Sequence, residues 1–456
     1  MPIEVISADQ ATAYGVSSGD DVFLLEGVNI ISTGDGISGI DTNQDGTTLT
    51  IRGNIIADRA IDLWGGAVIT LDNASVFVGA QGTVNATTDA IVLDNGLNNQ
   101  VINYGEIIAQ ETGIFSDGGS LRIENHGSIN SNGNVQGAIL IQGSTGGDNV
   151  REVINTGIIS GAPVDETLFT ATISNSGGAA FHLNNSGSII GGNERAVYSS
   201  ADENWITNSG IIDGAMRFTE ITEMFNSGTI DGEVDLSDVG DYYFGSGAGV
   251  VTGRLDLNGG NDEAIMGDAG SFVDGGTGDD TIRGGTGSDE IEGGDDNDDI
   301  RGRAGADNLD GGSGNDIVRA GRGDDVLDGG SGNDFMRGGA GDDVIIGGLG
   351  QDTMFGNAGA DVFDFNSAAE SPNAGVSWDR IMDFTQGQDL VDLSQFNARF
   401  IGTGAYAANG NIAEVRIFED PNGDTRVFVD VNADGTSDMR FYLVNTLGVT
   451  ADDFIL

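Results

Sequence analysis

The sequence predicts an all-β chain made of two consecutive solenoids, and three observations support this fold class. Among the 456 residues, 77 are Gly, only 4 are Pro and 38% are apolar. This composition is typical of sheets and turns rather than helix bundles. Two internal repeats of different period also run through most of the chain, and such repeats indicate solenoids. We therefore expect a parallel β-helix over 46–254 and a β-roll over 255–364. Residues 1–45 should form an N-terminal cap, and residues 365–456 a C-terminal β-rich module.

The charge balance excludes several classes of partner. The chain carries 72 acidic residues and 18 basic ones, all of them Arg, for a net charge of -54. Such a surface repels nucleic-acid phosphates and anionic lipids, and it attracts cations. No run of 18 apolar residues is present, so we expect no membrane insertion. The absence of Cys excludes disulfides, zinc thiolate clusters and cysteine nucleophiles.

The first repeat is Asn-x-Gly-x-Ile, and the residue two positions before its Asn is always apolar. Its Asn residues are Asn103, Asn125, Asn155, Asn185, Asn208 and Asn226. Stacked Ile and Val side chains, about 4.8 Å apart from coil to coil, would form the core of a β-helix. The Asn amides should bond from coil to coil. The Gly residues are expected to adopt the positive φ of a tight corner.

The second repeat has a period of nine and runs without insertion from Gly275 to Asp364. Position eight is always large and apolar, and position four is Gly except at Asp296. Other departures are Arg303 and Asn357 at position two and Ala320 at position one. Position six is Asp in all ten copies: Asp280, Asp289, Asp298, Asp307, Asp316, Asp325, Asp334, Asp343, Asp352 and Asp361.

This residue pattern suits calcium. Ca²⁺ prefers six to eight oxygens, and a Gly-rich turn that ends in Asp offers carbonyl and carboxylate oxygens together. Alternate repeats should lie on the same side of a flattened coil, so each ion would sit between one Asp and the Asp two repeats later. Ten repeats then leave room for about eight ions. Residues 275–364 contain 6 Arg and 21 acidic residues, and 6 minus 21 gives -15. About eight Ca²⁺ would supply a matching charge of about +16.

The nonapeptides resemble the RTX calcium-binding repeat, whose consensus is G-G-x-G-x-D-x-U-x. The last hundred residues resemble the C-terminal module of serralysin-like exoproteins, ending in Asp453-Phe454-Ile455-Leu456. These resemblances imply a calcium-folded protein that type I secretion machinery exports through an uncleaved C-terminal signal. Residues 1–12 lack the basic and apolar regions of a cleavable secretory signal. The expected location is therefore extracellular or at the cell surface.

Two classes of metal site receive less support. The zinc protease motif H-E-x-x-H is excluded, since the two His residues of the chain are His126 and His182. The segments 41–46 and 430–435 imitate EF-hand loops, but Arg52 and Phe441 occupy the position of the bidentate Glu. Hairpin turns are the favoured interpretation of both segments, and whether either binds calcium stays open.

The function of the β-helix has two interpretations. If the residue two before each Asn points inward, the residue three before it points outward. That column contains Gln100, Arg122, Glu152, His182, Trp205 and Glu223. Arg122, Glu152 and His182 could act on a uronate, as in the polysaccharide lyases and epimerases built on β-helices. A second outward column contains Tyr198, Arg217 and Asp235, and it could likewise be either a catalytic site or an ordinary sheet face.

An ordinary solvated sheet face is the favoured interpretation of both columns, because the outer faces of sheets commonly carry such mixed residues. His126 is expected to lie exposed at a corner. The coil repeats also resemble bacterial surface passenger domains. Our leading hypothesis is therefore a secreted, calcium-binding protein of adhesin, surface-layer or matrix type, which binds glycans or itself. The alternative is a carbohydrate-active enzyme on the β-helix.

Overall fold

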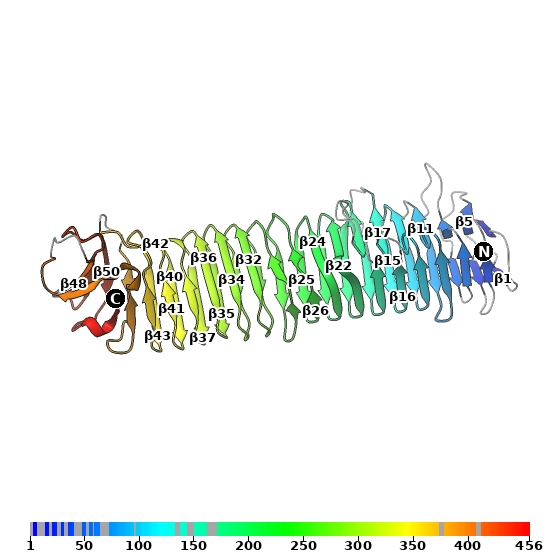
Figure 1. Cartoon of the computed structure of the whole chain (residues 1–456). Coiled ribbons are helices and arrows are strands. Elements are labelled where there is room, and N and C mark those ends of the chain that lie inside the picture. The colour runs from blue at the N-terminus through cyan, green and yellow to red at the C-terminus, as the bar shows by residue number, and fades with distance from the viewer. Residues whose placement is uncertain are drawn as a thin grey trace. The chain divides into compact units, whose positions relative to one another are not determined.

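The computed structural model is all-β and divides into two compact units, Met1–Leu255 and Asp256–Leu456. It describes residues 73–94, 97–132, 137–143, 150–161, 171–373, 378–406 and 412–456, and the strands β1 to β8 between residues 3 and 63. No helix in these parts of the chain is long and apolar enough to cross a bilayer. The two units are described separately below (Figure 1).

The first unit is a parallel β-helix, as predicted, with three strands in each regular coil. Strands β12 (Asn99–Asn103), β13 (Glu106–Ala109) and β14 (Ile114–Asp117) form one such coil. Each strand pairs in parallel with its counterpart in the next coil, as β12 does with β15 (Leu121–Asn125). Every coil therefore shares its backbone hydrogen bonds with two neighbours.

The strands of this unit fall into three columns. The first column contains β1 (Ile3–Ile6), β3 (Asp21–Leu24), β6 (Thr48–Ile51), β9 (Ser75–Val78), β12, β15, β18 (Val150–Asn155), β21 (Ala180–Asn185), β23 (Asn204–Asn208), β25 (Thr222–Asn226) and β28 (Tyr242–Gly245). The second contains β4 (Asn29–Ile31), β7 (Asn54–Ala57), β10 (Thr83–Ala86), β13, β16 (Ser128–Ser131), β19 (Ile158–Gly161), β26 (Thr229–Asp231) and β29 (Val250–Val251). The third contains β2 (Tyr14–Ser17), β5 (Asp35–Ile40), β8 (Arg59–Leu63), β11 (Ile91–Asp94), β14, β17 (Ile139–Gln142), β20 (Ile173–Ser176) and β27 (Val234–Asp235). Each of the long strands β22 (Ser188–Ser200) and β24 (Ile211–Phe218) pairs in the second column through its first part and in the third column through its last part.

The strands near the N-terminus pair in the same way as those of the regular coils. Strands β1 and β3 lie within residues 1–45, yet they already pair in parallel with each other, and β3 pairs with β6. Coil-type pairing therefore begins at Ile3, inside the segment that was expected to cap the first coil.

The predicted core of the β-helix is confirmed. Val101, Ile123 and Val153 stack in the first column with no exposed surface, and Ile129 and Ile159 do the same in the second. The Asn column is also confirmed. The side-chain amide of Asn103 donates to Oδ1 of Asn125 at 2.8 Å, and this pattern continues through Asn226.

The role expected for the repeat glycines is wrong. Gly127, Gly157 and Gly187 do not have positive φ. Instead, a Cβ on Gly157 would overlap the carbonyl oxygen of Gly127 in the preceding coil, and every later copy repeats this relation. Glycine is needed because adjacent coils approach closely at this corner.

The second unit begins with a flattened roll of two parallel sheets. One sheet contains β31 (Glu263–Ile265), β33 (Thr281–Arg283), β35 (Asp299–Ala304), β37 (Ile317–Arg322), β40 (Phe335–Ala340), β43 (Thr353–Ala358) and β45 (Arg380–Ile381). The other contains β32 (Phe272–Thr277), β34 (Glu290–Asp295), β36 (Asn308–Ser313), β38 (Val326–Asp328), β41 (Val344–Ile346), β44 (Val362–Asp364), β46 (Leu390–Asp392) and the short β39 (Ser331–Gly332) and β42 (Leu349–Gly350). Between β31 and β44, partners in one sheet are 18 residues apart, so alternate repeats share a side, as predicted. The position-eight side chains, such as Ile300 and Leu309, are buried between the sheets.

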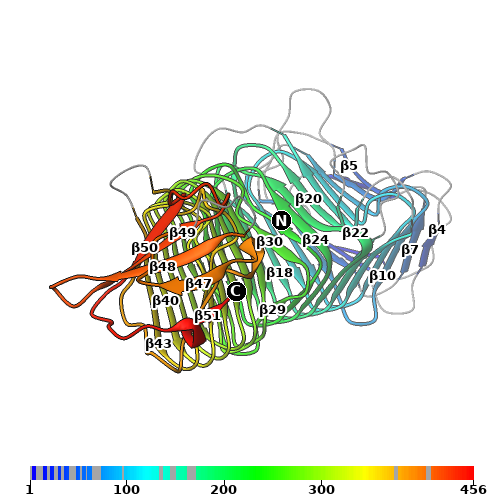
Figure 2. The same cartoon turned by 60° about the vertical axis from the view of Figure 1, so that its left-hand side comes forward.

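A small antiparallel sheet follows the roll in the second unit (Figure 2). Strand β48 (Glu414–Glu419) pairs with β49 (Thr425–Asp430), which pairs with β50 (Met439–Leu443), so the sheet contains two hairpins, including the one predicted at 430–435. Strand β47 (Arg399–Gly402) adds to β48, and β51 (Phe454–Ile455) pairs with β46. The short 3-10 helices η2 (Ser394–Phe396) and η3 (Ala451–Asp453) complete this region.

Candidate metal centre

The turns that join the two sheets of the roll are built by glycines at positions two and four. Gly312 and Gly314, for example, have φ of 93° and 145°, a region that L side chains rarely adopt. Three departures from the repeat occupy these same positions and keep the positive φ: Asp296 at 78°, Arg303 at 80° and Asn357 at 67°. The turn geometry therefore survives every departure at position two or four.

The ten position-six Asp side chains lie inside these turns, and each is at most 2% exposed. Their carboxylates join successive turns on the same side of the roll. The backbone N–H of Asp280 donates to Oδ1 of Asp298 at 2.8 Å, and the N–H of Asp298 donates to Oδ1 of Asp316 at 2.8 Å. The opposite side repeats this bond from Asp289 to Asp307 at 2.9 Å. One oxygen of each such carboxylate is thus held by the backbone of the preceding turn.

The second oxygen of these carboxylates is buried and has no hydrogen-bond donor. This holds for Oδ2 of nine of the ten position-six Asp residues. The exception is Asp289, whose Oδ2 accepts the backbone N–H of Gly285 at 2.8 Å. Oδ2 of Asp316 lies close to the first glycine of its own repeat, since a Cβ on Gly311 would be 2.7 Å from it. A buried polar atom without a partner costs about 1 to 3 kcal/mol. Nine such oxygens in two columns, beside Gly-rich turns, have the chemistry and placement that a hard divalent cation requires.

Burial also raises the pKa of these carboxyl groups. It raises the pKa of Asp316 to about 6, with Asp310 adding repulsion. It raises the pKa of Asp298 to about 7, where Asp280 and Asp316 add repulsion. The pKa of Asp334 is raised to about 8 for the same reasons. Protons and cations therefore compete for the same oxygens near neutral pH.

The structure extends both Asp columns beyond the ten repeats. The N–H of Asp352 donates to Oδ1 of Asp379 at 2.9 Å, and the N–H of Asp361 donates to Oδ1 of Asp389 at 3.1 Å. Asp379 is fully buried, and its Oδ2 also lacks a donor. At the other end, the N–H of Asp262 donates to Oδ1 of Asp280 at 2.8 Å.

Sequence reasoning missed these three residues, although a signal was present. Asp262, Asp379 and Asp389 are each followed, two positions later, by an apolar residue, as in the repeat. The turn glycines are incomplete there, so the full consensus does not find them.

Side chains alone do not complete a chelating cluster. In the described part of the chain, no group of three or more His, Asp or Glu side chains is arranged to hold a metal ion. A cation in the roll would therefore take most of its oxygens from the backbone carbonyls of the turns, with the Asp carboxylates adding charge.

Comparison with known proteins agrees with this geometry. The family model described as the RTX calcium-binding nonapeptide repeat (4 copies) matches residues 274–309, 301–336, 310–345 and 328–363. Residues 274–363 are RTX calcium-binding nonapeptide repeats. RTX repeats bind Ca²⁺, so the roll is a calcium-binding structure.

Other comparisons add little to the RTX assignment. No curated protein matches the chain. Among solved structures, the chain is similar to the solution structure of the AlgE6R3 subunit from the Azotobacter vinelandii mannuronan C5-epimerase. The identity is 26% over 41% of this chain and 78% of that one, and the TM-score is 0.17. A TM-score this low carries no argument about fold or activity.

The two EF-hand-like segments have different outcomes. Residues 41–46 lie outside the described residues. Residues 430–435 lie at the end of β49 and in the turn that leads to β50, as the hairpin interpretation predicts. The carboxylate of Asp430 accepts the N–H groups of Asp434 at 3.2 Å and Gly435 at 2.8 Å. That carboxylate stabilises its own turn.

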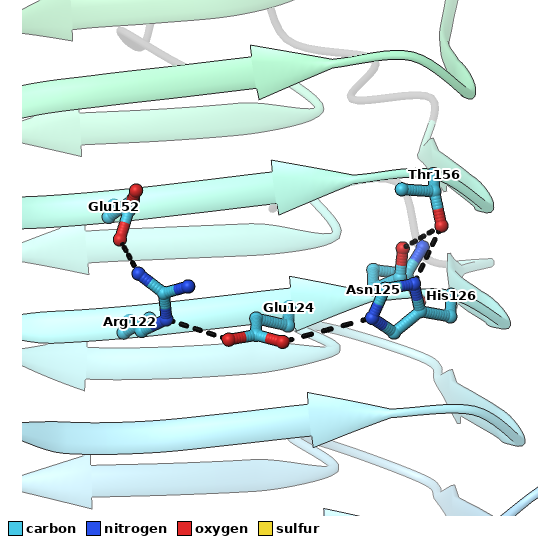
Figure 3. A network of polar contacts seen from close by, with 6 residues as sticks. All are labelled: Arg122, Glu124, Asn125, His126, Glu152 and Thr156. Atoms are coloured by element: carbon cyan, nitrogen blue, oxygen red, sulfur yellow. Dashed lines mark hydrogen bonds and ion pairs between the residues drawn. The ribbon is translucent and has the colours of Figure 1, made fainter.

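The outward column of the β-helix has the predicted register. Arg122 pairs with Glu152, Glu152 with His182, and His182 with Trp205. Arg122 forms ion pairs with Glu152 and, at 2.7 Å, with Glu124 (Figure 3). Its guanidinium is thus already paired with carboxylates, and hydrogen bonding to Glu124 raises its pKa. His182 instead lies near the Trp205 ring, with 6.0 Å between ring centroids.

The remaining candidates of the β-helix are also engaged. His126 was expected to be exposed, but it is half-buried, stacks on Tyr104 with 4.5 Å between centroids and bonds to Thr156 at 2.7 Å (Figure 3). In the predicted column of Tyr198, Arg217 and Asp235, Arg217 pairs with Asp235 at 3.3 Å, and Tyr198 is buried. An open pocket of about 390 Å³ lies beside Arg122 and Glu152.

Proposed function

We propose that this chain is a secreted extracellular protein of adhesin, surface-layer or matrix type, whose second unit folds around calcium after export. The observation that carries this proposal is the set of ten buried Asp carboxylates, nine of which have one oxygen lacking a donor. Without a cation, such a set opposes compaction through burial and mutual repulsion. With calcium, the same groups stabilise the roll, because metal binding is then coupled to folding.

Each ion would lie between the turns of an Asp and the Asp 18 residues later, as with Asp298 and Asp316. Their unpartnered oxygens would bind the ion, and turn carbonyls would complete its coordination. About eight ions would neutralise the repeats. Asp379 and Asp389 occupy the next places in the two columns, so we include them among the ligands. The C-terminal region would then close the calcium columns.

Calcium dependence also suits export. Extracellular calcium modules bind at about 10⁻⁴ to 10⁻³ M, far above cytosolic calcium. The roll would stay open inside the cell and fold outside it. Residues 365–456 would carry the signal for a type I channel. Deleting them should retain the chain in cells that export the intact chain, and secretion of the shortened chain in normal amounts would contradict this route.

The calcium assignment is tested with Asp316→Asn, because Asp316 lies in the middle of one column. The substitution keeps the shape and removes one charge. The calcium concentration at the midpoint of folding, followed by circular dichroism, should rise, and calorimetry should show fewer bound ions. Glu292→Gln is the matched control, since Glu292 is exposed in the same roll. Equal midpoints for Asp316→Asn and the unaltered chain would refute the assignment.

A carbohydrate-active enzyme is the second candidate, and the pocket beside Arg122 and Glu152 is the observation that favours it. An acidic sugar would have to displace the Arg122–Glu152 ion pair. Incubation with uronate polymers, followed by a search for shortened or unsaturated chains, separates the two functions. Turnover that disappears in Arg122→Ala and in His182→Ala would replace the binding role with a catalytic one.

A further inference from the structure

Position nine of the nonapeptides alternates in charge along the sequence. Its occupants over seven successive repeats are Arg283, Glu292, Arg301, Asp310, Arg319, Asp328 and Arg337. Successive repeats go to opposite sheets of the roll, so the alternation sorts these charges by side. Arg283, Arg301 and Arg319 pair in register on one sheet, while Glu292, Asp310 and Asp328 pair in register on the other.

The outer surface of the first sheet is called the arginine face here. Its outward residues are Arg283, Arg301, Arg319, Arg337, Glu263, Asp299, Thr281, Ile317 and Phe335. Four Arg against two carboxylates leave a net charge of +2, in a chain of net charge -54. Arg301 and Arg319 share Asp299 at 2.7 and 2.8 Å. Arg337 lies over the Phe335 ring, 5.0 Å from its centroid.

The outer surface of the second sheet is called the acidic face. Its outward residues are Asp274, Glu292, Asp310, Asp328, Phe272, Glu290, Asn308, Val326 and Val344. Five of these nine are carboxylates and none is basic. Glu292 and Asp310 are exposed, and among the described residues no arginine forms an ion pair with either.

This sorting of charge is unfavourable for an isolated roll. Residues directly opposite each other on neighbouring strands destabilise a sheet when their charges are alike. Here Arg301 lies between Arg283 and Arg319, and Asp310 lies between Glu292 and Asp328. Placing Arg and Asp in successive turns of the same sheet would have paired opposite charges instead. Ion pairs of Arg283 with Glu263, and of Arg301 and Arg319 with Asp299, offset this repulsion on the arginine face. Among the described residues no arginine does the same for Glu292 or Asp310, so the stability of the roll does not explain the acidic face.

We propose that the two faces bind each other, with the arginine face of one copy docking on the acidic face of a second copy. Both faces repeat with the same strand spacing of about 4.8 Å, so successive Arg residues match successive carboxylates. Each face also presents apolar side chains at the same end: Ile317 and Phe335 on one, Val326 and Val344 on the other. Val326 is 40% exposed. Charge complementarity would set the register, and these apolar groups would bury surface.

The geometry of this contact predicts open assemblies. The two faces are different surfaces on opposite sides of the roll, so each bound copy still offers one free face. Contacts of this kind do not close into dimers and extend into filaments or stacks. The inference rests on the proposed function in one respect, because the roll must first fold around calcium.

Two charge-reversed chains test the contact. One carries Arg301→Glu and Arg319→Glu, and the other carries Glu292→Arg and Asp310→Arg. In calcium and low salt, analytical ultracentrifugation should show assemblies of the unaltered chain and monomers of each variant alone. The dissociation constant of each variant should rise by about tenfold or more. An equimolar mixture should assemble again, because the intact acidic face of the first variant docks on the intact arginine face of the second. The two reversed faces also carry opposite charges, so they can extend the stack. Assembly of the unaltered chain should weaken with added NaCl.

Circular dichroism in calcium first establishes that each chain is folded. If a reversed variant fails to fold, a chain with the neutral substitutions Arg301→Gln and Arg319→Gln takes its place. Loss of the calcium response by the unaltered chain would contradict the proposed function. A calcium-folded chain that stays monomeric would contradict only the stacking contact. If that monomer were retained on a polygalacturonate column and the arginine variant were not, the arginine face would bind an anionic glycan instead of a second copy, and the stacking contact would be overturned. Variants that assemble like the unaltered chain would also overturn it.

Discussion

The backbone N–H of Asp280 donates to Oδ1 of Asp298 at 2.8 Å, while Oδ2 of Asp298 is buried without a donor. A single side chain thus serves the fold through one oxygen and stays available to a cation through the other. Because this relationship recurs along both sides of the roll, folding and calcium binding share the same carboxylates.

The pH dependence of the calcium-free roll follows from these carboxylates. Burial raises the pKa of Asp289 and Asp325 to about 6 and that of Asp343 to about 7. A raised folded-state pKa contributes stability that is fully present below the ordinary Asp value near 4. That stability is lost as pH rises through about 6 to 8. In chelator, the β signal of the roll should therefore be stronger at pH 4.5 than at pH 8.

Calcium should reverse this trend, because deprotonated carboxylates bind the ion more tightly. The calcium midpoint should fall as pH rises over the same range, as measured by circular dichroism at fixed ionic strength. A chelated roll that is equally ordered at both pH values would show that these carboxyls do not control its folding.

Adjacent isoleucines in the β-helix allow a matched test of its core. Ile159 is fully buried and Ile158 is 45% exposed. Ile159→Ala should lower the free energy of unfolding by about 2 to 5 kcal/mol, through lost burial and the cavity left behind. Ile158→Ala should change it by about 0.5 kcal/mol or less. Denaturant unfolding of the first transition measures both, and comparable losses would mean that Ile159 is not a core residue.

The corner glycines give a second test of the β-helix. A Cβ on Gly157 would overlap the carbonyl oxygen of Gly127, so Gly157→Ala should force adjacent coils apart. The cost should be about 1 to 3 kcal/mol or more, as for other overpacked sites. Thr156→Ala alters the neighbouring residue at the same corner and should cost less. A Gly157→Ala chain with an unchanged melting temperature would show that the coils can separate freely there.

Arg303 offers a stabilising substitution in the roll. Its φ of 80° is strained for a side chain, and its bond to the carbonyl of Gly284 is long, at 3.4 Å. Arg303→Gly should stabilise the calcium-bound roll by about 1 kcal/mol through relief of this strain. Arg322→Gly is the control, because Arg322 has no positive φ. Thermal unfolding in excess calcium compares them, and an Arg303→Gly chain that melts earlier would mean that the Arg303 side chain contributes more than its strain costs.

The candidate site was partly visible in the sequence. The ten position-six Asp residues could be found because period and residue type both repeat without insertion. Asp379 and Asp389 escaped notice, since insertions place them 27 and 28 residues after their partners instead of 18. Parallel pairing tolerates such insertions in the turns, so only the coordinates place these residues in the columns.

The sequence by itself determined the solenoid architecture. Periodic Ile residues such as Ile129 and Ile159 can bury their side chains only by stacking coil on coil, and a strict period of nine allows only alternate repeats to share a sheet. Tertiary structure decided what each repeated residue does. Gly157 is needed because adjacent coils approach closely at that corner, not because the corner requires a positive φ. Arg122 is paired with carboxylates rather than free to bind a substrate. Both outcomes depend on atoms in neighbouring coils, whose distances a linear pattern does not contain.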